Sequence, residues 1–132
     1  MEKEDSWKES IEEVSHFLKK IHAFLACGSC QLDTQRRRKD ENPLDSNSTM
    51  NTILDLNYNV EDIRDEVLSL TTRNYVETVK DKEREDNKHY RIFAKKINNR
   101  EIYIKLKICD LNRIHLISFH YANWDMEDRP YK

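Results

Sequence analysis

Basic, aromatic and imidazole side chains near the end of the chain have the chemistry needed to cut RNA. Tyr103, Lys105 and Lys107 alternate along one segment, and His120 lies in the next. Histidine exchanges protons near neutral pH, a phenol donates to a phosphate oxygen, and lysines carry fixed positive charge. Cleavage by the neighbouring 2′-hydroxyl needs a base, an acid and cations, and these residues supply them without a metal.

The preceding segment extends this basic surface. Seven lysines and arginines stand against one glutamate between Lys88 and Lys107, a balance of +6 in a chain of formal net charge −2. Such asymmetry predicts a basic surface on an acidic body. We expect lysines to hold phosphates and Tyr90 to stack on a base. The predicted catalytic residues are Tyr103, His120 and Lys105, and the predicted RNA-binding residues are Tyr90, Arg91, Lys96 and Lys107.

Length and composition exclude several classes of protein. The chain has 132 residues, 36% of them charged, and one glycine. This length fits a single domain, and one glycine is too few for a phosphate-binding glycine loop, so we expect no nucleotide cofactor. No apolar run reaches the ~20 residues that cross a bilayer, and the polar start MEKEDSWKES is unlike a secretory signal. Three cysteines suit a reducing compartment, so we expect a cytoplasmic protein away from membranes.

Apolar spacing predicts helices in the first half of the chain. Steps of three and four from Trp7 to Leu25 predict a helix over 6–26, capped by Ser6 and Glu9. The polar stretch 28–48 reads as a mobile loop. A helix over 49–57 follows, capped by Ser48 or Thr49, and Asn59 caps another over 60–70.

The period changes from helical to alternating after residue 88. We predict strands over 89–97, 100–109 and 114–121, with Asn98-Asn99 as a tight turn and 110–113 as the next. Residues 77–88 are charged and aperiodic. The fold class is therefore α+β, with N-terminal helices packed on a C-terminal three-stranded antiparallel sheet.

These turns fix the predicted register of the strands. The second hairpin opposes Tyr103 to His120, Lys105 to Ser118 and Lys107 to Leu116, and it turns His115 toward the core. The first hairpin opposes Glu101 to Lys96, Tyr103 to Ala94 and Lys107 to Tyr90. Tyrosine and lysine on the wet face of a sheet are also ordinary solubility residues, so the pattern alone leaves catalysis and simple solvation both open.

Several stretches together resemble a known family. Leu68-Ser69-Leu70-Thr71 leads to Asn74-Tyr75, and the chain continues with Asn99-Arg100-Glu101-Ile102-Tyr103-Ile104-Lys105-Leu106-Lys107 and Ile117-Ser118-Phe119-His120. Over about residues 48–121 this succession resembles the MqsR-type (motility quorum-sensing regulator) toxins, which are RelE-like mRNA interferases of type II toxin–antitoxin modules. The resemblance implies one RelE-like toxin domain over 1–132, a hydrolase that cleaves messenger RNA and is inhibited by a cognate antitoxin.

The resemblance also bears on single residues. Tyr103 matches the family's functional tyrosine on the central strand. His120 stands where some members have a lysine, and Glu77 stands where some members have an active lysine. The residue at 120 therefore gives an acid/base assignment that differs from the family pattern, and the residue at 77 removes one cation that the pattern would have.

Other readings stay open beside the nuclease. The same basic face would serve a non-catalytic protein that binds a protein or nucleic-acid partner, and a weaker third class is a transcriptional co-regulator. Cys27 and Cys30 invite a redox or zinc reading, although ordinary thiols at a helix end fit as well. The run Arg36–Lys39 is a solvated charge run or a second RNA contact, and Trp124 is a sheet-edge cover or a partner contact.

Overall fold

The computed structural model describes residues 6–27, 31–34, 44–81, 88–110, 113–123, 126 and 128–132. Its helices and strands confirm the α+β class predicted from the sequence. In chain order they are β1 (Ser6–Trp7), α1 (Ile11–Ala26), β2 (Gln31–Thr34), α2 (Thr49–Leu56), α3 (Val60–Leu68), η2 (Thr72–Asn74), β3 (Tyr75–Lys80), β4 (His89–Ile97), β5 (Arg100–Asp110) and β6 (Arg113–Tyr121).

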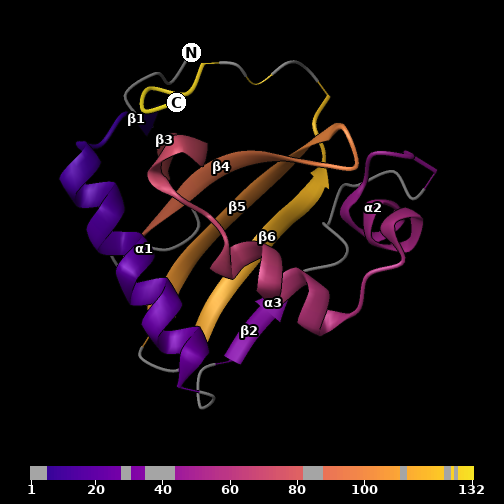
Figure 1. Cartoon of the computed structure of the whole chain (residues 1–132), viewed down its shortest axis with the longest axis horizontal. Helices are drawn as coiled ribbons and strands as arrows, with labels where there is room; N and C mark the ends of the chain where they lie inside the picture. Colours follow the sequence, from indigo (N-terminus) through magenta and orange to yellow (C-terminus); the bar gives the residue numbers. More distant parts are fainter. Residues whose placement is uncertain are drawn as a thin grey trace.

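The sheet is larger than the predicted three-stranded meander. Its strand order is β1-β3-β4-β5-β6-β2, in which every neighbouring pair is antiparallel except β6 and β2, which are parallel (Figure 1). The helices do not form an N-terminal block, because β1 precedes α1 and β2 lies between α1 and α2. The edge strands β1 and β2 were missed because they carry too few residues to show alternation, yet they cover sheet edges that would otherwise stay unpaired.

The first helix begins later than its sequence pattern suggested. Ser-x-x-Glu occurs twice, at Ser6 and again at Ser10, and the second copy forms the capping box with Glu13. Ser6 and Trp7 instead pair with β3. Glu9, which the first copy would have used for capping, is buried and bonds to Arg91. The choice between the two copies therefore depends on a residue 82 positions away.

The next two helices follow their predicted caps. Ser48 caps α2 through the Asn51 amide, and Asn59 forms a capping box with Asp62 at the start of α3. Both helices end slightly before the predicted positions. The stretch 77–88 looked aperiodic in sequence, but its first residues belong to β3, which has a register shift between Tyr75 and Glu77. That bulge breaks the alternation that would have identified the strand.

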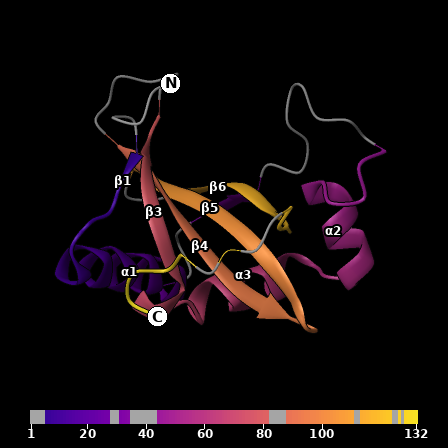
Figure 2. The ribbon, with the colours of Figure 1, turned by 90° about the horizontal axis from the view of Figure 1, so that it is seen from above.

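The main core lies between the sheet and the helices α1 and α3, which share one face of it (Figure 2). We call the opposite face the far face. It carries a second, smaller apolar cluster, made of Val76, Ile92, Ala94 and Met126. Met126 belongs to the C-terminal segment, so part of the predicted wet face is covered. Arg129 of the same segment pairs with Glu101 at 3.1 Å.

The two hairpin registers are largely those predicted. Asn98 and Asn99 have φ values of 54° and 68°, which fits a tight two-residue turn, and Lys96 opposes Glu101. Tyr103 opposes His120 and Lys105 opposes Ser118. Beyond that point a bulge shifts the pairing between β5 and β6.

The bulge changes which residue faces Lys107. Lys107 opposes His115 rather than the predicted Leu116, and Leu116 opposes Leu106 in the core. The predicted core position of His115 was therefore wrong. An extra residue in one strand reverses the facing of the residues beyond it, which alternation alone cannot indicate.

Candidate functional site

The rings of Tyr103 and His120 lie against each other on the far face. Their centroids are 4.9 Å apart and their planes differ by 12°, a stacked arrangement. Both side chains are half-buried, on the neighbouring strands β5 and β6. Nδ1 of His120 lies 2.9 Å from the carbonyl oxygen of Tyr121. A carbonyl only accepts, so Nδ1 carries the hydrogen in this bond and the neutral ring presents the lone pair of Nε2.

Two lysines and a buried serine occupy strand positions next to this ring pair. Lys105 opposes Ser118 one step along the strands, and its Nζ lies 5.2 Å from the centre of the Tyr90 ring. Lys96 is exposed on β4, opposite Glu101. The hydroxyl of Ser118 is buried and accepts or donates no hydrogen bond within the described part of the chain. The far face thus carries a proton acceptor, a phenol and two lysines over three successive registers on that face.

Two predicted RNA contacts, Tyr90 and Lys107, are buried in a polar cluster. Lys107 is 1% exposed, and its Nζ lies 2.6 Å from Oδ2 of Asp81. Tyr90 is 6% exposed, and its hydroxyl lies 3.1 Å from Nδ1 of His115. Lys107 also lies over the Tyr90 ring, 5.1 Å from its centre. Neither residue therefore offers the exposed surface that base stacking or phosphate contact was predicted to use.

The bulge in β6 explains this cluster. It turns His115 to the far face, where it meets Tyr90 and opposes Lys107. Asp81, just after β3, supplies the counter-charge. Sequence reasoning missed both His115 and Asp81, because one depends on the bulge and the other comes from a stretch without periodicity. The charge of Lys107 therefore forms a buried ion pair with Asp81 and does not lie on the surface.

Arg91, a further predicted RNA contact, points to the helix side. It donates to both carboxylate oxygens of Glu9, at 2.8 and 3.0 Å, and its guanidinium lies 4.5 Å from the centre of the Phe17 ring. Because side chains alternate along β4, Arg91 and Tyr90 point to opposite faces of the sheet. Burial acts to raise the pKa of Glu9, but the bonds from Arg91 and Thr78 and the charge of Arg91 outweigh it and lower the pKa.

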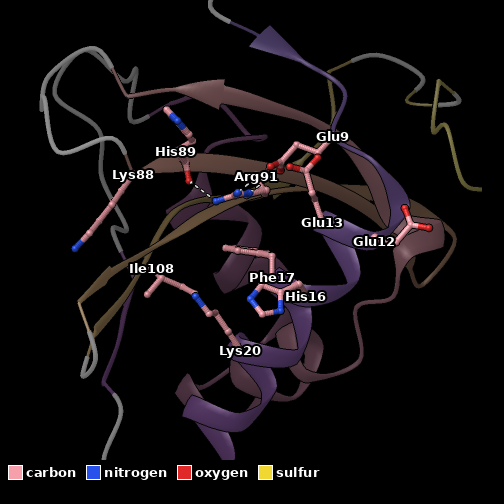
Figure 3. Close-up of a pocket in the computed structure, with 10 residues that line it drawn as sticks. All are labelled: Glu9, Glu12, Glu13, His16, Phe17, Lys20, Lys88, His89, Arg91 and Ile108. Atoms are coloured by element: carbon pink, nitrogen blue, oxygen red, sulfur yellow. Dashed lines mark hydrogen bonds and ion pairs between the residues drawn. The ribbon is translucent and has the colours of Figure 1, made fainter.

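A cavity of about 510 Å³ adjoins this ion pair on the helix side. Figure 3 shows Arg91 extended toward Glu9 and bonded to the His89 carbonyl, with Phe17 on α1 nearby. The cavity is lined by Glu9, Glu12, Glu13, His16, Phe17, Lys20, Lys88, His89, Arg91 and Ile108. Its charges are of both signs, and two of them are already engaged, since Arg91 donates to Glu9 and the Glu13 carboxylate accepts from the Ser10 amide. The cavity lies on the opposite side of the sheet from the Tyr103–His120 pair.

Other residues singled out by sequence take ordinary positions or lie outside the described residues. Cys27 is exposed at the end of α1, where its Sγ donates to the Phe24 carbonyl. Cys30, the run Arg36–Lys39 and Trp124 lie outside the described residues. Glu77 lies on β3 and opposes Ile92 on β4. The structure therefore has a carboxylate at the position where some members of the resembled family have a lysine.

We also searched for metal sites, membrane-spanning helices and known relatives of the chain. Within the described ranges, no group of three or more histidine, cysteine or acidic side chains is arranged to hold a metal ion. None of the helices among the described residues is both long and apolar enough to cross a bilayer. Family models, curated proteins and solved structures each gave no match to this chain.

Proposed function

We propose that the protein is a metal-independent endoribonuclease that cleaves messenger RNA, acting in the cytoplasm as the toxin of a type II toxin–antitoxin module. The observation that carries the proposal is the stacked Tyr103–His120 pair, whose hydrogen bond to Tyr121 leaves Nε2 of His120 as a proton acceptor. The resemblance to MqsR-type toxins supports the same assignment. A cognate antitoxin would bind the far face or an adjoining segment.

The proposed reaction uses the RNA's own 2′-hydroxyl. Nε2 of His120 takes the hydroxyl proton, the 2′-oxygen bonds to phosphorus, and the bond from phosphorus to the 5′-oxygen breaks. The leaving oxygen takes a proton from solvent, which gives a 2′,3′-cyclic phosphate and a 5′-hydroxyl. Tyr103 donates to a phosphate oxygen, and Lys105 offsets the growing negative charge.

The RNA surface is smaller than the sequence suggested. Lys96 and Lys105 are the lysines of the predicted set that retain a position for phosphate contact, since Lys107 is buried with Asp81. The burial of Tyr90 removes the predicted base-stacking contact, and the ring of Tyr103 is already stacked on the imidazole of His120. The substrate backbone would follow β5 and β6 rather than cross toward β3.

RNA cleavage in EDTA tests this proposal directly. We expect the purified chain to cut a single-stranded RNA and leave cyclic phosphate ends, and we expect a 2′-deoxy substitution at the cut position to abolish that cut. His120→Ala should lose about 10²-fold or more of the rate. His16→Ala, a change at an exposed histidine on α1, is the matched control and should cut normally. Full activity of His120→Ala would contradict the proposal.

A second candidate is a binding protein that uses the same face without catalysis. The burial of Lys107 with Asp81 favours it, because this pairing reduces the positive charge available for RNA. Expression of the chain alone separates the two candidates. A toxin arrests growth and is rescued by the product of a neighbouring gene, whereas a binding protein does neither.

A further inference from the structure

His120 is held by a residue that is itself fixed from several directions. The carbonyl oxygen of Tyr121 accepts from Nδ1 of His120 at 2.9 Å. The amide of Ala122, in the same peptide group as that carbonyl, donates to the Glu101 carbonyl at 2.9 Å. Because the N–H and C=O of a trans peptide point in opposite directions, this bond to β5 directs the Tyr121 carbonyl away from β5.

The helix α2 fixes Tyr121 at two further points. The amide of Tyr121 donates to Oγ1 of Thr52 at 3.0 Å, and its hydroxyl donates to Oδ2 of Asp55. On the other side, the guanidinium of Arg100 lies 3.5 Å from the centre of the Tyr121 ring. Tyr121 is 3% exposed, so these contacts leave its backbone little freedom.

The reason α2 can reach Tyr121 lies in the length of β2. That strand pairs with β6 over residues 113–116 alone, so it does not flank the end of β6 that carries His120. There, threonine hydroxyls from α2 accept from the strand amides instead: Thr49 from Phe119 at 3.3 Å and Thr52 from Tyr121. Both threonines are fully buried. Covering the edge of β6 would explain the bonds to Thr49 and Thr52 equally. Of these two bonds, however, only the one to Thr52 involves Tyr121, whose carbonyl holds His120.

We propose that Tyr121 is a positioning residue, and that α2, through Thr52 and Asp55, uses it to hold His120 in the tautomer with hydrogen on Nδ1. The tautomer itself does not depend on the proposed function, but its catalytic consequence does rest on it. A histidine with the wrong tautomer presents a hydrogen where the 2′-hydroxyl proton must be received. Seating of α2 would then control the reactivity of His120 without any contact between α2 and RNA.

Nitrogen NMR of the histidine-labelled full chain tests the tautomer, at alkaline pH where imidazoles are neutral. We expect Nδ1 of His120 to give the signal of a hydrogen-bearing nitrogen and Nε2 that of a bare one. Thr52→Val should reduce the Nδ1–H form of His120 at least about twofold, and Thr52→Ser should restore it. Thr49→Val, which removes the neighbouring threonine contact, should leave the signals unchanged.

A further variant covers the case in which Thr52→Val does not fold. Asp55 is exposed, so Asp55→Asn is expected to fold and to weaken the hold on Tyr121 in the same direction. In RNA cleavage, Thr52→Val should lower kcat on the order of tenfold with KM unchanged, the pattern of a misplaced proton acceptor.

The outcomes separate this proposal from the proposed function. A hydrogen on Nε2 in the wild-type protein, or equal signals in Thr52→Val and Thr49→Val, would overturn the positioning role even if RNA is cleaved. The expected signals in a protein that cuts no RNA would support the positioning role and contradict the nuclease.

Discussion

The imidazole of His120 stacks on the phenol of Tyr103 across two neighbouring strands, with ring centroids 4.9 Å apart. The stack separates two contributions of the tyrosine, since its ring packs against the imidazole and, in the proposed reaction, its hydroxyl donates to a phosphate oxygen. It also places both groups at one register of β5 and β6, where Lys105 follows a step further along. Substitutions in this arrangement, and in the ion pairs that support the sheet around it, have distinct expected effects.

Replacing Tyr103 separates its ring from its hydroxyl. Tyr103→Phe keeps the stack and removes the proposed phosphate donor, so we expect about a tenfold or greater loss in kcat with unchanged thermal stability. Tyr103→Ala removes the stack as well and should also shift the NMR signals of His120. If Tyr103→Phe cuts RNA at the wild-type rate, the hydroxyl has no part in the reaction.

Lys107 is expected to matter for stability rather than for RNA binding. Lys107→Met keeps the length of the side chain but leaves the Asp81 carboxylate without its partner, which should cost about 3–5 kcal/mol in urea unfolding. The double replacement Lys107→Met with Asp81→Asn should recover most of that loss. Lys96→Ala, at an exposed position, is the control and should change stability by less than about 0.5 kcal/mol. A stable Lys107→Met protein with weakened RNA binding would reverse this assignment.

The Glu9–Arg91 ion pair predicts sensitivity to acid. The pKa of Glu9 is lower in the folded protein than its ordinary value of 4.5, so the pair's stabilisation is complete above that pH and is lost as the pH falls through the lowered value. Glu9→Gln should lose about 3 kcal/mol at neutral pH and show a shallower fall in stability below pH 4.5 than the wild type. Chemical unfolding at a series of pH values measures both.

The control for this series is Glu12→Gln, a change at an exposed glutamate in the first turn of α1. It should keep wild-type stability at neutral pH, because its side chain is already in solvent. Equal stability of Glu9→Gln and Glu12→Gln would show that the bond to Arg91 contributes nothing to folding.

The turn between β4 and β5 is expected to tolerate glycine and to resist β-branched residues. Asn98 and Asn99 both have positive φ, a conformation open to glycine and asparagine and costly for others. Asn99→Gly should keep or slightly raise the free energy of unfolding, whereas Asn99→Val should lower it by about 1–2 kcal/mol. A stability at Asn99→Val equal to the wild type would contradict the turn geometry.

Local sequence is enough to specify the central hairpins and the residues that they bring together. Alternation along residues 100–109 and the Asn98-Asn99 turn are local features, because side chains on a strand repeat every two residues and the turn residues set the register. The Asn98-Asn99 turn predicts that Lys96 opposes Glu101, and the turn expected over 110–113 predicts that Tyr103 opposes His120; the observed registers confirm both pairs. The caps at Ser48 and Asn59 are local in the same sense.

Features that depend on distant residues are decided by tertiary contacts. Whether Glu9 caps a helix or pairs with Arg91, whether Lys107 is exposed or pairs with Asp81, and whether Thr52 reaches Tyr121 are each settled by contacts between parts far apart in the chain. The bulge in β6 adds one unpaired residue and reverses the facing of His115. Burial of a charge or a shift of register costs free energy that only a specific partner from elsewhere offsets, and a single sequence does not name that partner.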